Sequence, residues 1–305
     1  MKEDGGRLRT NVVIWSKSLS SGKELALTRR KGDETIHDAL CGSKLWPTAV
    51  RRCCSWRLLM VLSRTPDIKV NGPLTMLDIE RVIERHRDAL VQHPFMLRLE
   101  GTGTIEQFRR TLPRHAFFTL AFQDVLRLAR DKCEDPQIRE IARKHELEDK
   151  GHDLWYLDDL ARLGVALDVR WMFSAEHEFA RDVGYALVSQ VLSAGDDRSR
   201  LAVVLSLEAI GREFFVRVPG FAERLGVAHG LKYFAVRHLD IERSHDVFRN
   251  DGKRQLGAIG IDEQVVPEVL SSIERTFELM AMLADDLDAA LRGDSDSPPR
   301  AAVAR

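Results

Sequence analysis

The chain has 305 residues, of which 44% are hydrophobic, so it can bury a sizeable core within one domain. Its formal charge is −1, with 46 basic and 47 acidic side chains. This balance excludes a general electrostatic attraction to nucleic acid or to an anionic membrane, and we expect a small-molecule partner instead.

The N-terminal segment lacks the pattern of a folded domain. Residues 1–75 show no sustained hydrophobic period of about 2 or about 3.6 residues, so we predict that they are disordered. The alternative is an over-extended gene start, with Met76 as the natural first residue. The apolar run LLMVL at 58–62 is too short to span a bilayer, and the 4 cysteines include no CxxC pair. We therefore expect a soluble, cytoplasmic protein with no membrane partner.

From residue 76 onward the pattern is helical. Apolar residues recur with a period of about 3.6, strand alternation is not convincing anywhere, and clusters of Gly, Pro and Asp separate the periodic segments. We predict an all-α domain over 76–292 and a disordered, polar tail over 293–305. The predicted helices cover residues 77–92, 104–111, 114–131, 135–163, 174–194, 199–216, 228–249 and 262–292.

The first motif with metal-binding chemistry is HELEDKGHDLWYLDDL at 145–160. On a helix, His145, Asp149 and His152 lie on one stripe, with Glu148 just to its side. A helical Glu-x-x-His pattern supplies ligands in dimetal carboxylate bundles. Here Asp149 matches the acidic position and Glu148 is the rival, although a helix this rich in charge is also typical of a solvated surface.

The second motif is a lone glutamate inside an apolar run, LAVVLSLEAIGREFF at 201–215. On a helix, Glu208 shares its face with Leu205 and Phe215, so it lies on the core face. Burying an unpaired carboxylate is costly, so we expect a compensating cation beside it. A metal ion is one such cation, and Arg212 is the alternative partner.

The third motif is RHLDIERSH at 237–245, in which His238, Glu242 and His245 are spaced to share one helical stripe. An exposed row of salt bridges is the alternative interpretation. Imidazole and carboxylate together suit Fe(II) or Mn(II), whereas structural zinc favours cysteine and a closed tetrahedron. The three motifs therefore predict a site for two divalent ions with positions left for dioxygen and substrate.

The order of these motifs resembles the haem-oxygenase-like dimetal oxidase and oxygenase family, relatives of thiaminase II (TenA) and of pyrroloquinoline-quinone synthase (PqqC). The matching parts read HELEDKGHDLWYLDDLARLG, then Glu208, then HLDIERSH, within about residues 77–290. The resemblance implies a single seven-helix haem-oxygenase-like bundle, with Glu242 at a place where the family more often has Asp. The metal ligands that it implies are His152, Glu208, His238, Glu242 and His245, together with Asp149 or Glu148.

The resemblance also implies a function. We expect an iron-dependent oxidoreductase, a non-haem diiron oxidase or oxygenase with two Fe(II) per chain, and Mn(II) as the alternative metal. Such an enzyme activates dioxygen and oxidises a small organic acid or amine. Two other functions stay open, a metal-free enzyme of the TenA or PqqC kind and a non-catalytic helical binding module, and so does a homodimeric state.

Overall fold

The computed structural model describes residues 73–242 and 250–293, all of which belong to one compact unit, Trp56–Arg305. The segments predicted to be disordered, 1–75 and 293–305, lie outside the described residues except at their inner ends. At those ends, Thr75 forms an isolated antiparallel bridge with Gly260, and Gly293 caps the last helix. Thr75 is held because its backbone N–H and its hydroxyl both donate to the Asp78 carboxylate, at 2.8 and 2.7 Å.

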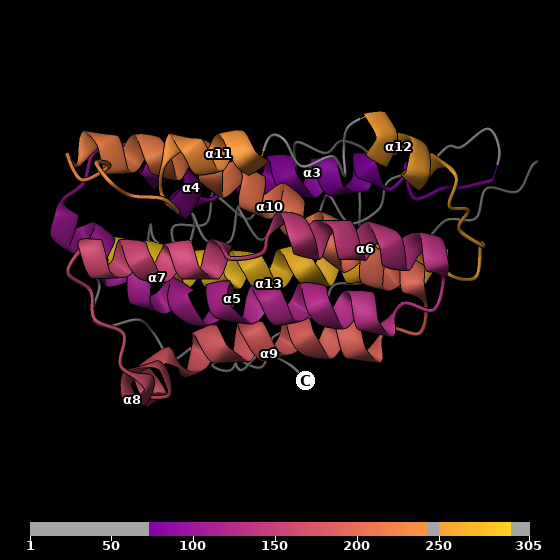
Figure 1. The fold of residues 1–305 in the computed structure, drawn as a ribbon, viewed down its shortest axis with the longest axis horizontal. Coiled ribbons are helices and arrows are strands. Elements are labelled where there is room, and N and C mark those ends of the chain that lie inside the picture. Colours follow the sequence, from indigo (N-terminus) through magenta and orange to yellow (C-terminus); the bar gives the residue numbers. More distant parts are fainter. Residues whose placement is uncertain (1–72, 243–249, 294–305) are drawn as a thin grey trace, which may run out of the picture. The chain divides into compact units, whose positions relative to one another are not determined.

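The predicted all-α class is confirmed, because the described residues form helices and contain no β-strand (Figure 1). Within this part of the chain, no helix combines the length and the apolar character needed to cross a membrane. The helical segments are more numerous than the seven that the resemblance implies. They are α3 (Glu80–Val91), α4 (Pro94–Leu99), α5 (Ile105–Lys132), α6 (Pro136–Glu148), α7 (His152–Arg162), α8 (Val169–Met172), a 3₁₀ turn η1 (Ala175–His177), α9 (Glu178–Ser193), α10 (Asp197–Arg224), α11 (Val236–Glu242), α12 (Asn250–Gly257) and α13 (Val266–Arg292).

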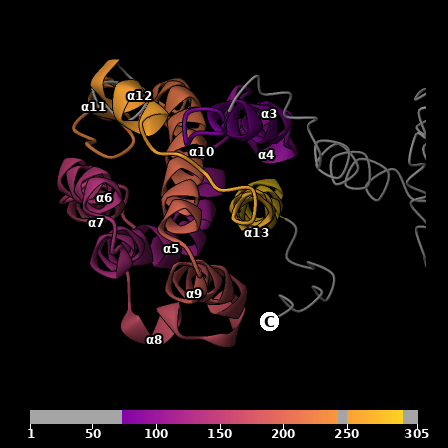
Figure 2. The same cartoon turned by 90° about the vertical axis from the view of Figure 1, so that its right-hand side faces the viewer.

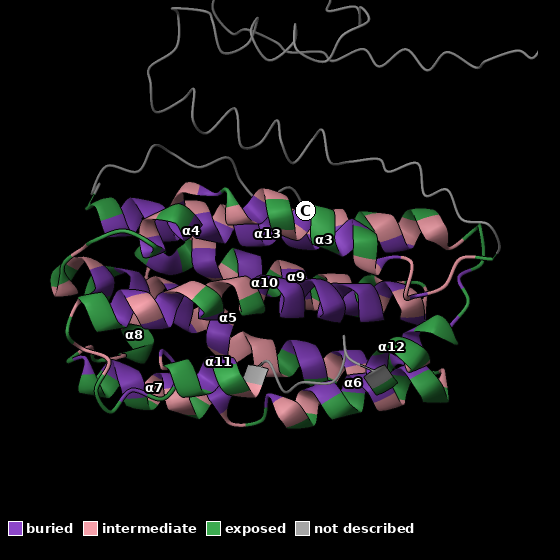
Figure 3. Ribbon diagram, turned by 90° about the horizontal axis from the view of Figure 1, so that it is seen from above, coloured by how far each residue is buried: buried purple, intermediate pink, exposed green. Residues whose placement is uncertain are grey.

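Helix α10 lies at the centre of the bundle. Figure 2 shows it surrounded by other helices, and it contacts α3, α4, α5, α6, α9, α11 and α13. Every residue from 201 to 210 is buried, so α10 has no solvent-facing side along this stretch. In the outer helices α3, α6 and α7, by contrast, buried and exposed residues alternate in stripes (Figure 3). Glu208, the one charged residue between 201 and 210, therefore lies deep in the bundle.

Two predicted helix ends are wrong because the helices continue through a proline. Helix α5 joins the predicted segments 104–111 and 114–131 across Pro113, and α10 extends beyond residue 216 across Pro219. A proline inside a helix removes one backbone hydrogen bond and costs about 3 kcal/mol. Both helices pack along their length against several others, and this burial outweighs the local penalty.

The predicted helix 135–163 is also wrong, since it is split into α6 and α7. The break occurs at Gly151, whose φ of 91° is a left-handed conformation that glycine adopts at little cost. Downstream, the helix predicted from residue 228 begins only at Val236. The segment before it is held instead by Asp159, which accepts hydrogen bonds from the backbone N–H groups of Lys232 and Phe234. Both departures shape the candidate site.

Candidate metal centre

The turn between α6 and α7 positions two of the predicted ligands. Asp149 is the C-cap of α6 and His152 is the first residue of α7, so the left-handed Gly151 turns the chain between them. The Asp149 Oδ1 and His152 Nδ1 atoms are 3.1 Å apart. The side-chain amide of Gln123, on α5, donates to the backbone carbonyl of Asp149 at 2.9 Å and fixes the turn against the bundle. Asp149 and His152 thus face each other across a turn.

A buried group of donor atoms lies between this turn and α10. His145, Asp149 and Glu208 each offer one ligand atom within 4.8 Å of the others. His145 Nε2 lies 3.1 Å from Glu208 Oε2 and 3.9 Å from Asp149 Oδ2. All three side chains are buried, with exposed fractions of 1%, 4% and 7% in chain order. One imidazole and two carboxylates buried this closely could hold a divalent metal ion.

The electrostatics of this group favour a positive charge at His145. Burial alone lowers the pKa of His145, but the attraction of Glu208, supported by Asp149 and Glu148, outweighs it and raises the pKa to about 9. Without metal, the imidazolium proton therefore compensates the two carboxylates in part. Asp149 Oδ2 still has no hydrogen-bond partner among the described residues, and a buried oxygen in that state is costly. The group therefore fits a bound cation better than a structural ion pair.

A second set of donor atoms adjoins the first. His238 Nδ1 lies 2.7 Å from the backbone carbonyl of Tyr233, which can only accept, so Nδ1 carries the proton. In the neutral ring, His238 Nε2 then presents its lone pair, 3.1 Å from His152 Nδ1. A hydrogen bond from one ring nitrogen to a backbone carbonyl is typical of metal-ligating histidines, because it fixes the tautomer and the orientation of the ring. Since His152 Nδ1 also lies 3.1 Å from Asp149 Oδ1, potential ligand atoms of three side chains converge here.

Asp159 fixes the position of His238. Its carboxylate is fully buried and accepts from the N–H groups of Lys232 at 2.8 Å and Phe234 at 3.0 Å. These two residues flank Tyr233, whose carbonyl receives the His238 proton. Asp159 belongs to the motif at 145–164 but is not among the predicted ligands. Its position one residue after the exposed Asp158 gave no signal, because only the structure shows which carboxylate faces inward.

The remaining predicted residues fall into two groups. Glu148 is half-buried and lies outside the three-residue group, although it contributes to the electrostatic environment of His145. The side chain of Glu242, at the end of α11, lies outside the described part, as does the whole of His245. His145 lies on the predicted stripe but is not among the predicted ligands, whereas the structure places it in the three-residue group. Its spacing of four residues from Asp149 was the available signal.

Aromatic rings surround the two histidines of the second set. The Trp155 ring stacks on His152, with ring centroids 4.7 Å apart, and Phe215 packs against His238 at 4.0 Å. Tyr233 also contacts His238, at 4.9 Å. Such rings hold the imidazoles in place and keep bulk water from the site.

No protein-family model and no curated protein matches this chain. The family resemblance therefore depends on the sequence motifs alone.

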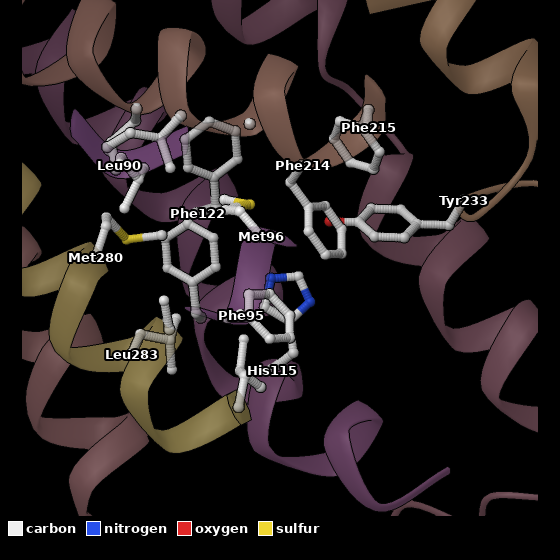
Figure 4. Close-up of a pocket in the computed structure, with 16 residues that line it drawn as sticks. Leu90, Phe95, Met96, His115, Phe122, Phe214, Phe215, Tyr233, Met280 and Leu283 are labelled. Carbon is white, nitrogen blue, oxygen red and sulfur yellow. The ribbon is translucent and has the colours of Figure 1, made fainter. Parts of the chain in front are cut away.

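An apolar pocket adjoins the candidate metal centre, and Figure 4 shows the residues that line it. It is a cavity of about 80 Å³ lined by residues of α3, α4, α5, α10 and α13 and by Tyr233. Phe215 and Tyr233, which pack against His238, also belong to its wall. Gly211, one turn beyond Glu208, lines it as well, and a Cβ atom there would meet no atom within 4 Å. The pocket therefore reaches the helix turn that carries Glu208.

Proposed function

We propose that this chain is an iron-dependent oxidase or oxygenase that holds two Fe(II) ions, or alternatively Mn(II), and uses dioxygen to oxidise a small organic molecule. The observation that supports it best is the run of short contacts from Glu208 through His145, Asp149 and His152 to His238. These five buried side chains come from α6, α7, α10, α11 and the turn between α6 and α7. Imidazole and carboxylate groups gathered in this way are the ligand types that suit Fe(II) or Mn(II).

In this proposal, Asp149 rather than Glu148 is the acidic ligand of the first motif. One oxygen of Asp149 faces His145 and the other faces His152, so its carboxylate lies between the two sets of donor atoms. Glu148 is half-buried on the neighbouring side of the helix. His145 joins the ligands because its Nε2 faces both carboxylates. Glu242 and His245 complete the proposed set from the sequence motif.

The chain's own residues supply charge, orientation and shielding. Bound iron would supply the electrons that dioxygen needs and that side chains cannot provide. Asp149 and Glu208 provide the negative charge that holds divalent cations. The Tyr233 carbonyl keeps the proton of His238 on Nδ1, so that the Nε2 lone pair is directed toward His152. The rings of Trp155 and Phe215 shield the imidazoles from bulk water.

The metal-free alternative in the manner of thiaminase II needs a nucleophile. Cys133 is the free cysteine within the described residues, and it is buried at the C-cap of α5. Burial raises the pKa of its thiol to about 12, so the reactive thiolate is not populated at neutral pH. This cysteine is unsuited to covalent catalysis, which disfavours that alternative.

The test of this proposal is anaerobic reconstitution with Fe(II), followed by iron analysis and oxygen-uptake measurements. We expect wild-type protein to retain iron and to consume oxygen on exposure to air, and Glu208→Gln to lose both properties. Glu223→Gln is the matched control, because it makes the same change at an exposed position of the same helix. A wild-type protein that retains no iron would refute the proposal and favour the non-catalytic binding module.

A further inference from the structure

The walls of the pocket beside the metal centre carry no charge. Among the described residues that line it, none is acidic or basic at neutral pH, and only His115 and Tyr233 bring polar side-chain atoms. The rest are aliphatic, aromatic or thioether side chains, including Phe95, Met96 and Met280 (Figure 4). A carboxylate or ammonium group placed here would be buried without an ionic partner, at a cost of several kcal/mol. The lining therefore selects against charged ligands.

His115 is one of the two polar side chains in this wall. It lies on α5 with an exposed fraction of 8%, and its ring contacts the rings of Phe118, Tyr156 and Phe214. Burial lowers the pKa of His115 from 6.5 to about 4, so the imidazole is neutral at pH 7. Figure 4 shows this ring among the aromatic and thioether side chains of the pocket.

The contacts of His115 decide which hydrogen bond it can offer. The Thr119 hydroxyl donates its one hydrogen to the backbone carbonyl of His115, at 3.2 Å, and lies 3.3 Å from Nδ1. Because that hydrogen is used, Nδ1–H donates to the hydroxyl oxygen, and Nε2 keeps its lone pair. In the described part of the chain Nε2 has no other hydrogen-bond partner. The imidazole is therefore an acceptor set in an apolar wall.

We infer that this pocket binds a small, uncharged and mostly apolar molecule, and that His115 accepts a hydrogen bond from its one donor group. As a substrate site, this inference rests on the proposed function, because Phe215 and Tyr233 place the pocket against His238. An acidic or amino group of the substrate would have to lie at the metal end. His115 is then a specificity-determining residue, since its acceptor distinguishes an alcohol or phenol from a hydrocarbon of the same shape.

The test measures binding directly, in full-length, metal-free protein labelled with ¹³C at its methionine methyl groups. Met96 and Met280 line the pocket, so their methyl signals report its occupancy. The probes are toluene, p-cresol and p-toluate, which share a ring and a methyl group but differ in the hydroxyl or carboxylate. We expect toluene and p-cresol to shift both signals in a saturable manner, and p-toluate to bind at least about tenfold more weakly.

Two variants examine the residues. Gly211→Leu fills the pocket at a position where an added Cβ meets no neighbour, so it should fold and should abolish both shifts. Gly211→Ala is its control and should keep them. His115→Phe should keep toluene binding but raise the ratio of the p-cresol to the toluene dissociation constant about tenfold, because the buried hydroxyl loses its acceptor.

Each outcome decides a part of the inference. Unshifted Met96 and Met280 signals, equal binding of p-toluate, or unchanged binding in a folded Gly211→Leu protein would overturn the ligand class. An unchanged ratio in His115→Phe would overturn the role of His115. These measurements need neither iron nor turnover. The inference about the pocket and the proposed iron-dependent function can therefore fail independently of each other.

Discussion

Replacing Glu208 by glutamine should remove most of the stability that a divalent metal gives this protein. Glutamine keeps the size and one acceptor oxygen for His145 but removes one of the two carboxylate charges within the three-residue group. A ligand that binds only the folded state stabilises it by RT ln(1 + [L]/Kd), or about 2.7 kcal/mol at a concentration of 100 Kd. For a domain of this size that is a rise in Tm of about 5–11 °C. If the lost ligand weakens binding about 100-fold, the same concentration gives only about 0.4 kcal/mol.

The assay is thermal unfolding with and without Mn(II), which does not oxidise in air as Fe(II) does. Each protein serves as its own metal-free reference, so any change that the substitution makes in the His145–Glu208 pair cancels. Glu223→Gln, on the exposed face of α10, should respond to Mn(II) as the wild type does. Equal metal-dependent rises in Tm for wild type and Glu208→Gln would refute the assignment of Glu208 as a ligand.

Three further predictions concern residues around the site. Because the folded-state pKa of His115 is about 4 and its ordinary value is 6.5, the unfolded state takes up the proton first as pH falls. Between pH 7 and pH 5, the unfolding free energy of the wild type should therefore fall by about 2 kcal/mol more than that of His115→Phe. Urea unfolding at the two pH values measures this difference. Gly151→Ala should lower the unfolding free energy by about 1–2 kcal/mol, because φ at this position is 91°, although an added Cβ would meet no atom within 4 Å. The same variant should bind Mn(II) more weakly. Unchanged stability would contradict the strained turn. Asp159→Asn leaves one acceptor oxygen for the N–H groups of Lys232 and Phe234, so it should lower the unfolding free energy by about 1–3 kcal/mol. It should also reduce the affinity for Mn(II). A rise in Tm with Mn(II) equal to that of the wild type would argue against a positioning role of Asp159.

The proposed roles divide the buried polar residues by what they touch. In the proposed site, His145 and Glu208 would contact the metal directly, whereas Asp159 would act through the Tyr233 carbonyl and His238. A positioning residue should be rescued in part by a conservative substitution that keeps an acceptor. Asp159→Ala should therefore weaken Mn(II) binding more than Asp159→Asn, and equal effects of the two would indicate a purely structural role.

The sequence by itself determined the helical class and the ingredients of the site. Apolar residues at helical spacing produce helices that must pack together, and a glutamate inside such a run must be buried with compensation. Glu208 was recognisable for that reason, since its neighbours from 201 to 210 are almost all apolar. The spacing of Asp149 and His152 likewise kept the two side chains in contact, even though the chain turns at Gly151 between them.

Only the tertiary structure decided which of these residues meet. Spacing along a helix fixes the angle between side chains on that helix, but it says nothing about the distance to another helix. His145 rather than Glu148 faces Glu208 because α6 packs against α10 with that stripe inward. The prolines at 113 and 219 do not end their helices, because burial against several neighbours outweighs a local penalty. The orientation of His238 depends on a carbonyl that Asp159 holds from another helix, a contact between residues more than seventy positions apart in the chain.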